Sequence, residues 1–315
     1  MKKFGKFALA SAMLLAVLTG CSTQSSVETQ PQPQASGDAG AADDKVTIGL
    51  AISTQNNPFF VTLKEGAEKA AQEAGAELIV VDAQDDTAKQ ISGVEDLIQK
   101  KVDVLLINPT DGAAIGTAIE AANKANIPVI TVDRAAESGQ VVSHIASDNV
   151  KGGQMAGEYI LEALGGKGNI VELQGIAGTS AARDRGQGFH NAVDGKDGVK
   201  VVASQPADFD RAKGMSVMEN ILQGNKDIQA VFAHNDEMAL GALQAIEAAG
   251  LNIPIVGFDA TDDAVKAVNE GKLAATVAQK PALIGEMAVK TALQVTKGEK
   301  VENFIPVELE LVTKK

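Results

Sequence analysis

Two kinds of apolar pattern alternate along the chain from residue 45 to its end. Short continuous runs such as VTIGLAI at residues 46–52 and VDVLLI at residues 102–107 are separated by longer stretches with apolar residues at helical spacing. Continuous β-branched runs are typical of strands buried on both faces of a parallel sheet. The strand–helix alternation therefore predicts βαβ units and the α/β class.

The alternating pattern occurs twice, and corresponding strands end in the same residue types. One apolar run ends at Asn108, and the next strand, IPVITV, ends at Asp133. In the second half a run ends at Asn235, and the next strand, IPIVGF, ends at Asp259. Two matches in the same order predict two lobes of like topology. The segments after Asp259 exceed the needs of the second lobe, so we expect some of them to return to the first.

Aromatic residues stand at the carboxyl end of the first predicted strand. Asn57 is a favourable N-cap and Pro58 suits the first helical position, which places Phe59 and Phe60 at a helix N-terminus. Open α/β sheets bind ligands at the carboxyl ends of their strands. The alternative is that both rings only fill the core under the loop.

The first twenty residues form a predicted export signal. Lys2, Lys3 and Lys6 precede an apolar stretch at residues 7–17 that is too short to span a bilayer. The following LTGC sequence resembles the bacterial lipobox, in which the cysteine is lipid-modified, so we expect lipidation of Cys21. A plain secretory signal is the alternative, and either form implies export.

Residues 21–44 are predicted to be a disordered tether, because they consist of Ser, Gln, Pro, Gly, Ala and Asp with almost no large apolar residue. Cys21 is the only cysteine, so no disulfide can form within the chain. The net charge of −13 becomes more negative once the lysines of the signal are removed. Nucleic acid is therefore not expected as a partner.

Planar polar groups and phenylalanines gather at the predicted strand ends. Carboxylates accept hydrogen bonds, Arg donates in a rigid fork, and Asn and Gln do both. Sugars need this mixture of partners, and their C–H faces pack on aromatic rings. The alternative for each position is that Asn or Asp only caps a helix. The candidate ligand-binding set is Asn57, Phe59, Phe60, Asn108, Asp133, Arg134, Arg185, Phe209, Asn235, Phe258, Asp259 and Gln279.

Other chemistries lack their sequence signatures. The three histidines are scattered without metal-ligand spacing, so neither a metal nor a histidine-based catalytic site is expected. The GIAGTS loop at residues 175–180 lacks both the GxGxxG pattern and the P-loop lysine. Ser180 has no GxSxG context. We therefore expect a binding protein without a cofactor rather than an enzyme.

From residue 47 to 315 the chain resembles the periplasmic sugar-binding proteins of ABC transporters, and in particular those that bind D-ribose. The segments that carry this resemblance are ST-x-NNPFF (53–60), LINPTD (106–111), IPVIT-x-DR (127–134), VSHIASDN (142–149), ELQGIAGTSAAR (172–183), SQPADFDR (204–211) and NDEMALGAL (235–243).

The resemblance implies a type I periplasmic-binding fold with two doubly wound parallel-sheet lobes and a three-segment hinge. The N-terminal lobe would comprise residues 45–147 plus 280–308, and the C-terminal lobe residues 148–279 plus 309–315. Hinge closure around the sugar would precede docking on the membrane subunits of an ABC permease. We expect a monomer, and a chemoreceptor is a further candidate partner.

The resemblance also implies a role for each member of the candidate set. Asp133 and Asp259 would accept hydrogen bonds from ring hydroxyls, and Arg134 and Arg185 would donate. Phe59, Phe60 and Phe209 would pack on the faces of the sugar, and Phe258 would form a wall of the site. The amide side chains of Asn57, Asn108, Asn235 and Gln279 would complete the polar shell. The departure from the family is at the N-terminus, where Cys21 and the tether imply a lipoprotein on the outer face of the cytoplasmic membrane.

Three alternatives stay open. A sugar-responsive regulator shares the two-lobe core but needs a basic helix-turn-helix, which residues 1–44 do not offer. An exported glycosidase needs a carboxylate pair with separate roles. Asp133 and Asp259 could form such a pair, but neighbouring arginines are expected to keep both ionised. Within the binding class, the ligand could be another monosaccharide or a furanose-like signal molecule.

Overall fold

The structure, a computed structural model, describes residues 45–314. The predicted signal, Cys21 and the tether lie outside the described residues. Within residues 45–314, no helix has the length and apolar character needed to cross a membrane.

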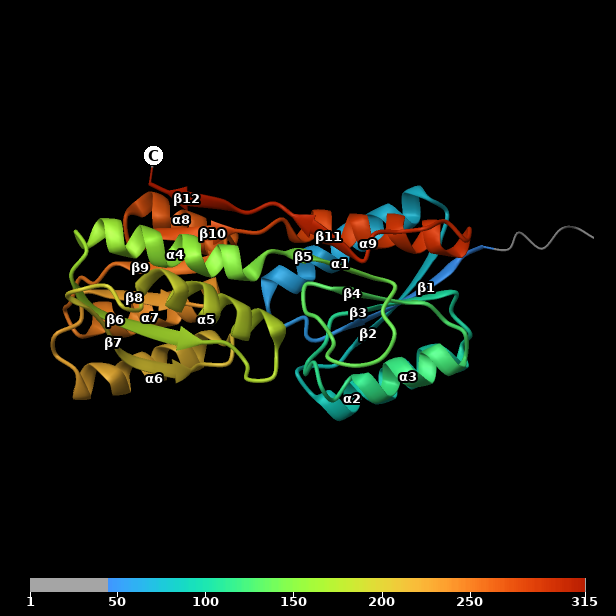
Figure 1. The fold of residues 1–315 in the computed structure, drawn as a ribbon, viewed down its shortest axis with the longest axis horizontal. Coiled ribbons are helices and arrows are strands. Elements are labelled where there is room, and N and C mark those ends of the chain that lie inside the picture. Colours follow the sequence, from blue (N-terminus) through green and yellow to red (C-terminus); the bar gives the residue numbers. More distant parts are fainter. Residues whose placement is uncertain (1–44, 315) are drawn as a thin grey trace, which may run out of the picture. The chain divides into compact units, whose positions relative to one another are not determined.

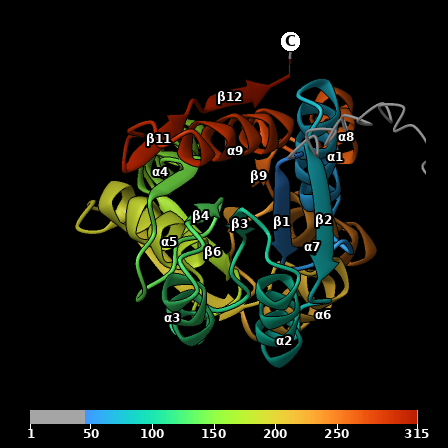
Figure 2. The same ribbon diagram turned by 90° about the vertical axis from the view of Figure 1, so that its right-hand side faces the viewer.

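The first lobe is a six-stranded sheet in the order β11-β5-β4-β3-β1-β2, and every neighbouring pair is parallel. Helices α1 and α9 cover one face and α2 and α3 the other, so each face has its own apolar core (Figure 2). The elements are β1 (Thr47–Ile52), α1 (Pro58–Glu73), β2 (Glu77–Asp82), α2 (Thr87–Gln99), β3 (Val104–Ile107), α3 (Gly116–Lys124), β4 (Val129–Val132), β5 (Ser143–Ser147), α9 (Pro281–Thr296) and β11 (Phe304–Val307).

The second lobe repeats this plan in the order β12-β10-β9-β8-β6-β7, and only β12 runs antiparallel to its neighbour (Figure 1). Helices α4 and α5 cover one face and α6, α7 and α8 the other. The elements are α4 (Asn149–Ala163), β6 (Gly168–Gln174), α5 (Ser180–Val193), β7 (Val199–Pro206), α6 (Arg211–Gly224), β8 (Ala230–Ala233), α7 (Asp236–Ala248), β9 (Ile255–Asp259), α8 (Asp262–Glu270), β10 (Ala275–Ala278) and β12 (Glu310–Thr313). Two lobes of like topology are therefore confirmed.

The chain passes between the two sheets three times: between β5 and α4, between β10 and α9, and between β11 and β12. The apolar pattern of residues 304–312 by itself predicts one last strand, and this prediction is wrong, whereas the lobe bounds implied by the resemblance change lobe between residues 308 and 309. Two short strands occupy that region and pair in different sheets. A continuous β-favouring run does not reveal a change of sheet, because local propensity is the same in both.

Asn57 caps helix α1 as predicted. Its Oδ1 accepts a hydrogen bond from the Phe59 backbone N–H at 2.9 Å, and Pro58 occupies the first turn. β1 ends at Ile52 and the cap starts α1 after a short loop, which places Phe59 and Phe60 at the carboxyl edge of the sheet.

Helices α4 and α5 approach so closely that glycine is required at their contact. A Cβ atom on Gly153 of α4 would lie 2.0 Å from the backbone oxygen of Arg185 on α5. A Cβ atom on Gly188 of α5 would lie 1.9 Å from the backbone oxygen of Val150. Real Cβ contacts are never that short, so these glycines set the position of α5 and of the arginine that it carries.

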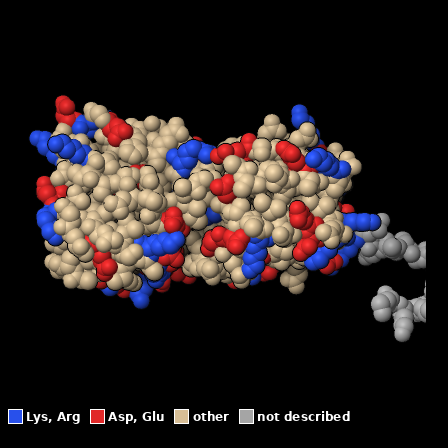
Figure 3. Space-filling model, turned by 90° about the horizontal axis from the view of Figure 1, so that it is seen from below, with Lys and Arg blue, Asp and Glu red and all other residues tan. Residues whose placement is uncertain are grey.

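Acidic and basic side chains are interspersed on the face of the molecule seen in Figure 3. A nucleic-acid site needs a basic patch or stripe. That face shows none, in keeping with the acidic composition.

Candidate functional site

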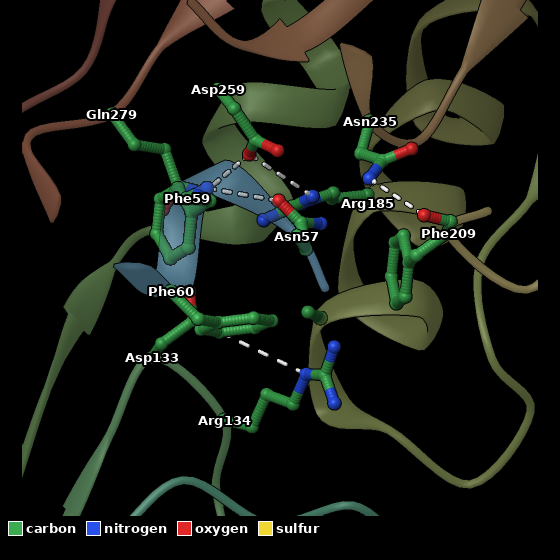
Figure 4. A pocket seen from close by; sticks show the side chains of 11 residues that line it. Asn57, Phe59, Phe60, Asp133, Arg134, Arg185, Phe209, Asn235, Asp259 and Gln279 are labelled. Carbon is green, nitrogen blue, oxygen red and sulfur yellow. Dashed lines mark hydrogen bonds and ion pairs between the residues drawn. The ribbon is translucent and has the colours of Figure 1, made fainter. Parts of the chain in front are cut away.

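A small cavity lies between the lobes at the carboxyl ends of their strands (Figure 4). Both lobes contribute to it, and its polar lining residues are at most 9% exposed. Its lining consists of Asn57, Phe59, Phe60, Asp133, Arg134, Ala181, Arg185, Phe209, Asn235, Asp259 and Gln279.

The structure brings ten of the twelve candidate residues to this one cavity. Ala181 also lines it and is absent from the candidate set, because a small apolar side chain carries no chemical signal in the sequence. Asn108 and Phe258 do not line the cavity, so their expected direct contact with a ligand has no geometric support.

Asn108 and Phe258 lie directly behind lining residues. The Asn108 amide donates to the Val132 backbone oxygen at 3.1 Å and to Asp133 Oδ2 at 3.4 Å. The Phe258 ring lies under the Arg185 guanidinium, 3.8 Å from ring centroid to Cζ. The Phe258 ring is fully buried in the apolar core under α4 and α5, so it does not face the cavity. Asn108 instead orients Asp133, and Phe258 orients Arg185.

Two carboxylates and two guanidinium groups face each other around the cavity. Arg134 Nε lies 3.8 Å from Asp133 Oδ2, and Arg185 Nη1 lies 3.7 Å from Asp259 Oδ1. Because each lobe supplies one acid and one base, the charges nearly cancel. This balance favours a neutral, hydroxyl-rich ligand over an anion.

Burial raises the pKa of Asp133, although Arg134 and Arg185 oppose the shift. Burial likewise raises the pKa of Asp259 well above its ordinary value, against the effect of Arg185. The arginines act in the direction expected from the sequence, because they favour the ionised carboxylates, and burial opposes them. Desolvation of a fully buried carboxylate outweighs the favourable charge at this distance.

Polar atoms without protein partners concentrate at the cavity. Within residues 45–314, four buried side-chain nitrogen or oxygen atoms lack a hydrogen-bond partner, and three belong to lining residues: Asp133 Oδ1, Arg134 Nε and Gln279 Oε1. An unsatisfied buried polar group costs about 1–3 kcal/mol. A ligand with both donors and acceptors would remove that cost.

Aromatic rings complete the lining. Phe59 and Phe60 meet edge to face with centroids 5.2 Å apart. The Arg134 guanidinium lies 4.9 Å from the Phe60 centroid and 5.3 Å from that of Phe209. Phe59 and Phe60 also belong to the apolar core between α1 and the sheet. Phe59 and Phe60 therefore fill the core and line the cavity at the same time.

Backbone strain also concentrates here. Asp133, Phe209 and Asp259 have positive φ angles of 60°, 58° and 117°. Residues other than glycine rarely adopt such angles, at a cost of about 1–3 kcal/mol each. Strain of this kind persists where the surroundings impose it, and it is frequent at ligand sites.

Hydrogen bonds join the lobes beside the cavity without involving its lining side chains. The Gly112 backbone N–H donates to the Gly178 oxygen at 3.0 Å, and the Ala135 N–H donates to Ser180 Oγ at 2.8 Å. Arg183 Nη1 lies 3.1 Å from Glu137 Oε1. The lobes are therefore in contact, and the cavity is closed on this side.

The described residues contain no group of three or more His, Cys, Asp or Glu side chains that could hold a metal ion. The chemistry available at the cavity is hydrogen bonding and aromatic packing, which is suited to recognition of a small polar molecule.

Comparison with known proteins agrees with this geometry. A family model described as periplasmic binding protein domain matches residues 48–300. A ribose import binding protein of Escherichia coli is 58% identical over 86% of this chain and 91% of its own length. One of Haemophilus influenzae is 53% identical over 96% of this chain and 98% of its own length.

Solved structures show the same likeness. An ABC transporter solute binding protein of Mycobacterium smegmatis with bound glycerol superimposes with a TM-score of 0.83 at 38% identity, covering 86% of this chain and 94% of its own. The matched sequence, the two-lobe topology and the cavity between the lobes lead to one conclusion. The chain belongs to the periplasmic binding protein family.

Proposed function

We propose that this protein is the substrate-binding component of an ABC importer and that it captures D-ribose in the cavity between its lobes. One observation carries the proposal: unpartnered buried polar atoms and aromatic rings face the same small, charge-balanced cavity. Sequence identity of 53–58% to ribose import binding proteins supports ribose as the sugar. The proposal involves no catalysis.

In the proposed complex, sugar hydroxyls donate to Asp133 Oδ1 and Gln279 Oε1 and accept from Arg134 Nε. The ring faces pack against phenylalanine side chains of both lobes. Because the ligand touches both lobes at once, it favours the closed state over an open one. The closed protein then docks on the permease and releases its sugar there.

A thermal-unfolding panel tests the proposed ligand. A ligand at one hundred times its dissociation constant stabilises a fold by about 2.7 kcal/mol. We expect D-ribose to raise the melting temperature clearly and D-glucose, D-galactose and D-xylose to have little effect. A shift with another sugar alone would contradict ribose as the ligand while keeping the transport role, and no shift with any sugar would contradict both.

Another monosaccharide is the second candidate, because structural relatives carry other ligands. A protein of Actinobacillus succinogenes with bound D-allose is 32% identical, with a TM-score of 0.81. A myo-inositol binding protein of Caulobacter is 29% identical, with a TM-score of 0.82. D-Allose and myo-inositol therefore belong in the same panel.

We expect the affinity for D-ribose to fall as the pH is lowered from neutral into the acid range. The pKa values of Asp133 and Asp259 are raised, so these groups take up protons at a higher pH than ordinary carboxyl groups do. A protonated carboxyl loses acceptor capacity for sugar hydroxyls. Calorimetric titrations across this range measure the effect. An affinity independent of pH would contradict a direct role for these carboxylates.

We propose lipid anchoring through Cys21 on the outer face of the cytoplasmic membrane, with residues 21–44 as the tether. We expect the substitution Cys21→Ser to move the protein from the membrane fraction to the soluble fraction. Fractionation of cells expressing either form measures this, with an integral membrane protein as the control. Continued membrane association of Cys21→Ser would contradict the lipobox reading.

The N-terminal lobe of the proposed protein comprises residues 45–147 plus 280–308, and the C-terminal lobe comprises residues 148–279 plus 309–315.

The proposed protein acts as a monomer, and a chemoreceptor is a second proposed partner that binds the closed form. Light scattering with and without ribose tests the monomer. Chemotaxis of a strain that lacks the protein tests the receptor.

A further inference from the structure

A buried polar cluster lies in the second lobe behind the cavity, and none of its members lines the cavity. Its centre is Glu172 on β6, whose side chain is fully buried. Glu172 Oε1 accepts from His234 Nε2 at 2.9 Å, and Oε2 accepts from Gln174 and from Ser204 Oγ. His190 Nε2 lies 3.4 Å from Oε2. These donors outweigh burial and lower the pKa of Glu172 to about 2, so the carboxylate stays charged.

The contacts of His234 fix its tautomer. Nδ1 accepts the backbone N–H of Gly175 at 3.3 Å, so the ring proton must reside on Nε2, where it is donated to Glu172. Burial lowers the pKa of His234, which keeps the ring neutral. Gly186 of α5 lies against the pair, since a Cβ atom there would be 3.3 Å from both Glu172 Oε1 and His234 Cε1. The imidazole is thus held on both edges.

Gly175 connects this ring to the cavity. It is buried, and a Cβ atom on it would lie 2.0 Å from Cζ of Phe209. The Phe209 ring therefore rests directly on the Gly175 backbone. Phe209 is also held at a positive φ of 58°, so its orientation depends on the surfaces that surround it.

We infer that His234, held by Glu172, is a positioning residue for ligand binding: its Nδ1 anchors the Gly175 backbone, which is the platform for Phe209. This inference rests on the proposed function, because sugar affinity is its readout. The competing view is that the Glu172–His234 pair only stabilises the lobe. The two views differ in which edge of the imidazole matters for binding.

Two substitutions of His234 separate its two hydrogen bonds. The amide oxygen of His234→Asn can take the place of Nδ1 and accept from Gly175, but it leaves Glu172 without this donor. The amide nitrogen of His234→Gln can take the place of Nε2 and donate to Glu172, but it leaves the Gly175 N–H without an acceptor. Calorimetric titration with D-ribose gives the affinity of each, and urea unfolding without sugar gives the stability.

We expect His234→Gln to bind D-ribose about tenfold more weakly than the unaltered protein, since it loses one buried hydrogen bond under the platform. We expect His234→Asn to bind within about threefold of the unaltered protein and to be the less stable of the two, because it removes a donor from a buried charge. Unchanged affinity of His234→Gln would overturn the inference. That variant retains the bond to Glu172, so the test holds even if His234→Asn does not fold.

A double-mutant cycle checks the route through Phe209. If His234 acts through this ring, His234→Gln adds little further loss of affinity once Phe209→Ala is present, whereas independent effects would add. Additive losses would overturn the route. Failure of the proposed function gives a different result, because the unaltered protein would then not bind D-ribose at all.

Discussion

Replacing Arg185 by alanine should lower the affinity for D-ribose by at least about 2 kcal/mol, or about thirtyfold. Arg185 is 2% exposed, and its guanidinium contacts α4, β9 and the loop after β8. Nε donates to Asn149 Oδ1 at 2.8 Å, Nη1 donates to the His234 backbone oxygen at 2.5 Å, and Nη1 lies 3.7 Å from Asp259. Its removal deletes a charged donor from the cavity and leaves Asp259 without its nearest cation. Calorimetric titration measures the affinity.

Arg183 provides the matched control for this change. It lies on the same helix two positions earlier, its side chain is 55% exposed, and it pairs with Asp184 and, across the lobes, with Glu137, outside the cavity. Exposed ion pairs contribute about 0–1 kcal/mol, so Arg183→Ala should change the affinity little. Arg185→Lys retains the charge and serves as a second variant if Arg185→Ala does not fold. Equal affinities for the Arg185 and Arg183 variants would remove Arg185 from the binding site.

The largest expected effect on stability follows from Gly153→Ala, which should lower the free energy of unfolding by about 3 kcal/mol. The added methyl group would lie 2.0 Å from the Arg185 backbone oxygen, so α4 and α5 must separate. Because α5 carries Arg185, ribose affinity should fall as well. Urea unfolding followed by circular dichroism measures the stability.

Gly224→Ala is the control for glycine replacement. Gly224 ends helix α6, and a Cβ atom on it would meet no atom within 4 Å. Alanine at an unstrained position with free space stabilises a protein by about 0.4–1 kcal/mol. Wild-type stability of Gly153→Ala would contradict the close helix contact described above.

The sequence predicts the architecture well because its strongest signals are periodic. Buried parallel strands need continuous apolar runs, and the matched ends at Asn108–Asp133 and Asn235–Asp259 mark the repetition of one topology. Residues near the carboxyl ends of strands converge by the geometry of the fold, which explains why most of the candidates share one cavity, whereas Arg185 reaches it from within α5. Such convergence requires no knowledge of side-chain packing.

The apolar periodicity and the matched strand ends do not predict side-chain direction or contacts between distant segments. Phe258 packs into the core under α4 and α5, although its neighbour Asp259 lines the cavity. The change of sheet between β11 and β12 depends on pairing partners distant in the sequence. The link from Glu172 to Phe209 joins β6, the loop after β8 and the segment after β7, so no local sequence motif predicts it.

A crystal structure of the protein grown with D-ribose tests the central claim most directly. The account predicts one sugar in the cavity between the lobes, with hydroxyls within hydrogen-bond distance of Asp133 Oδ1, Arg134 Nε and Gln279 Oε1. Its ring would lie between phenylalanines of the two lobes. Sugar bound elsewhere, or a cavity without sugar at saturating ribose, would contradict the account.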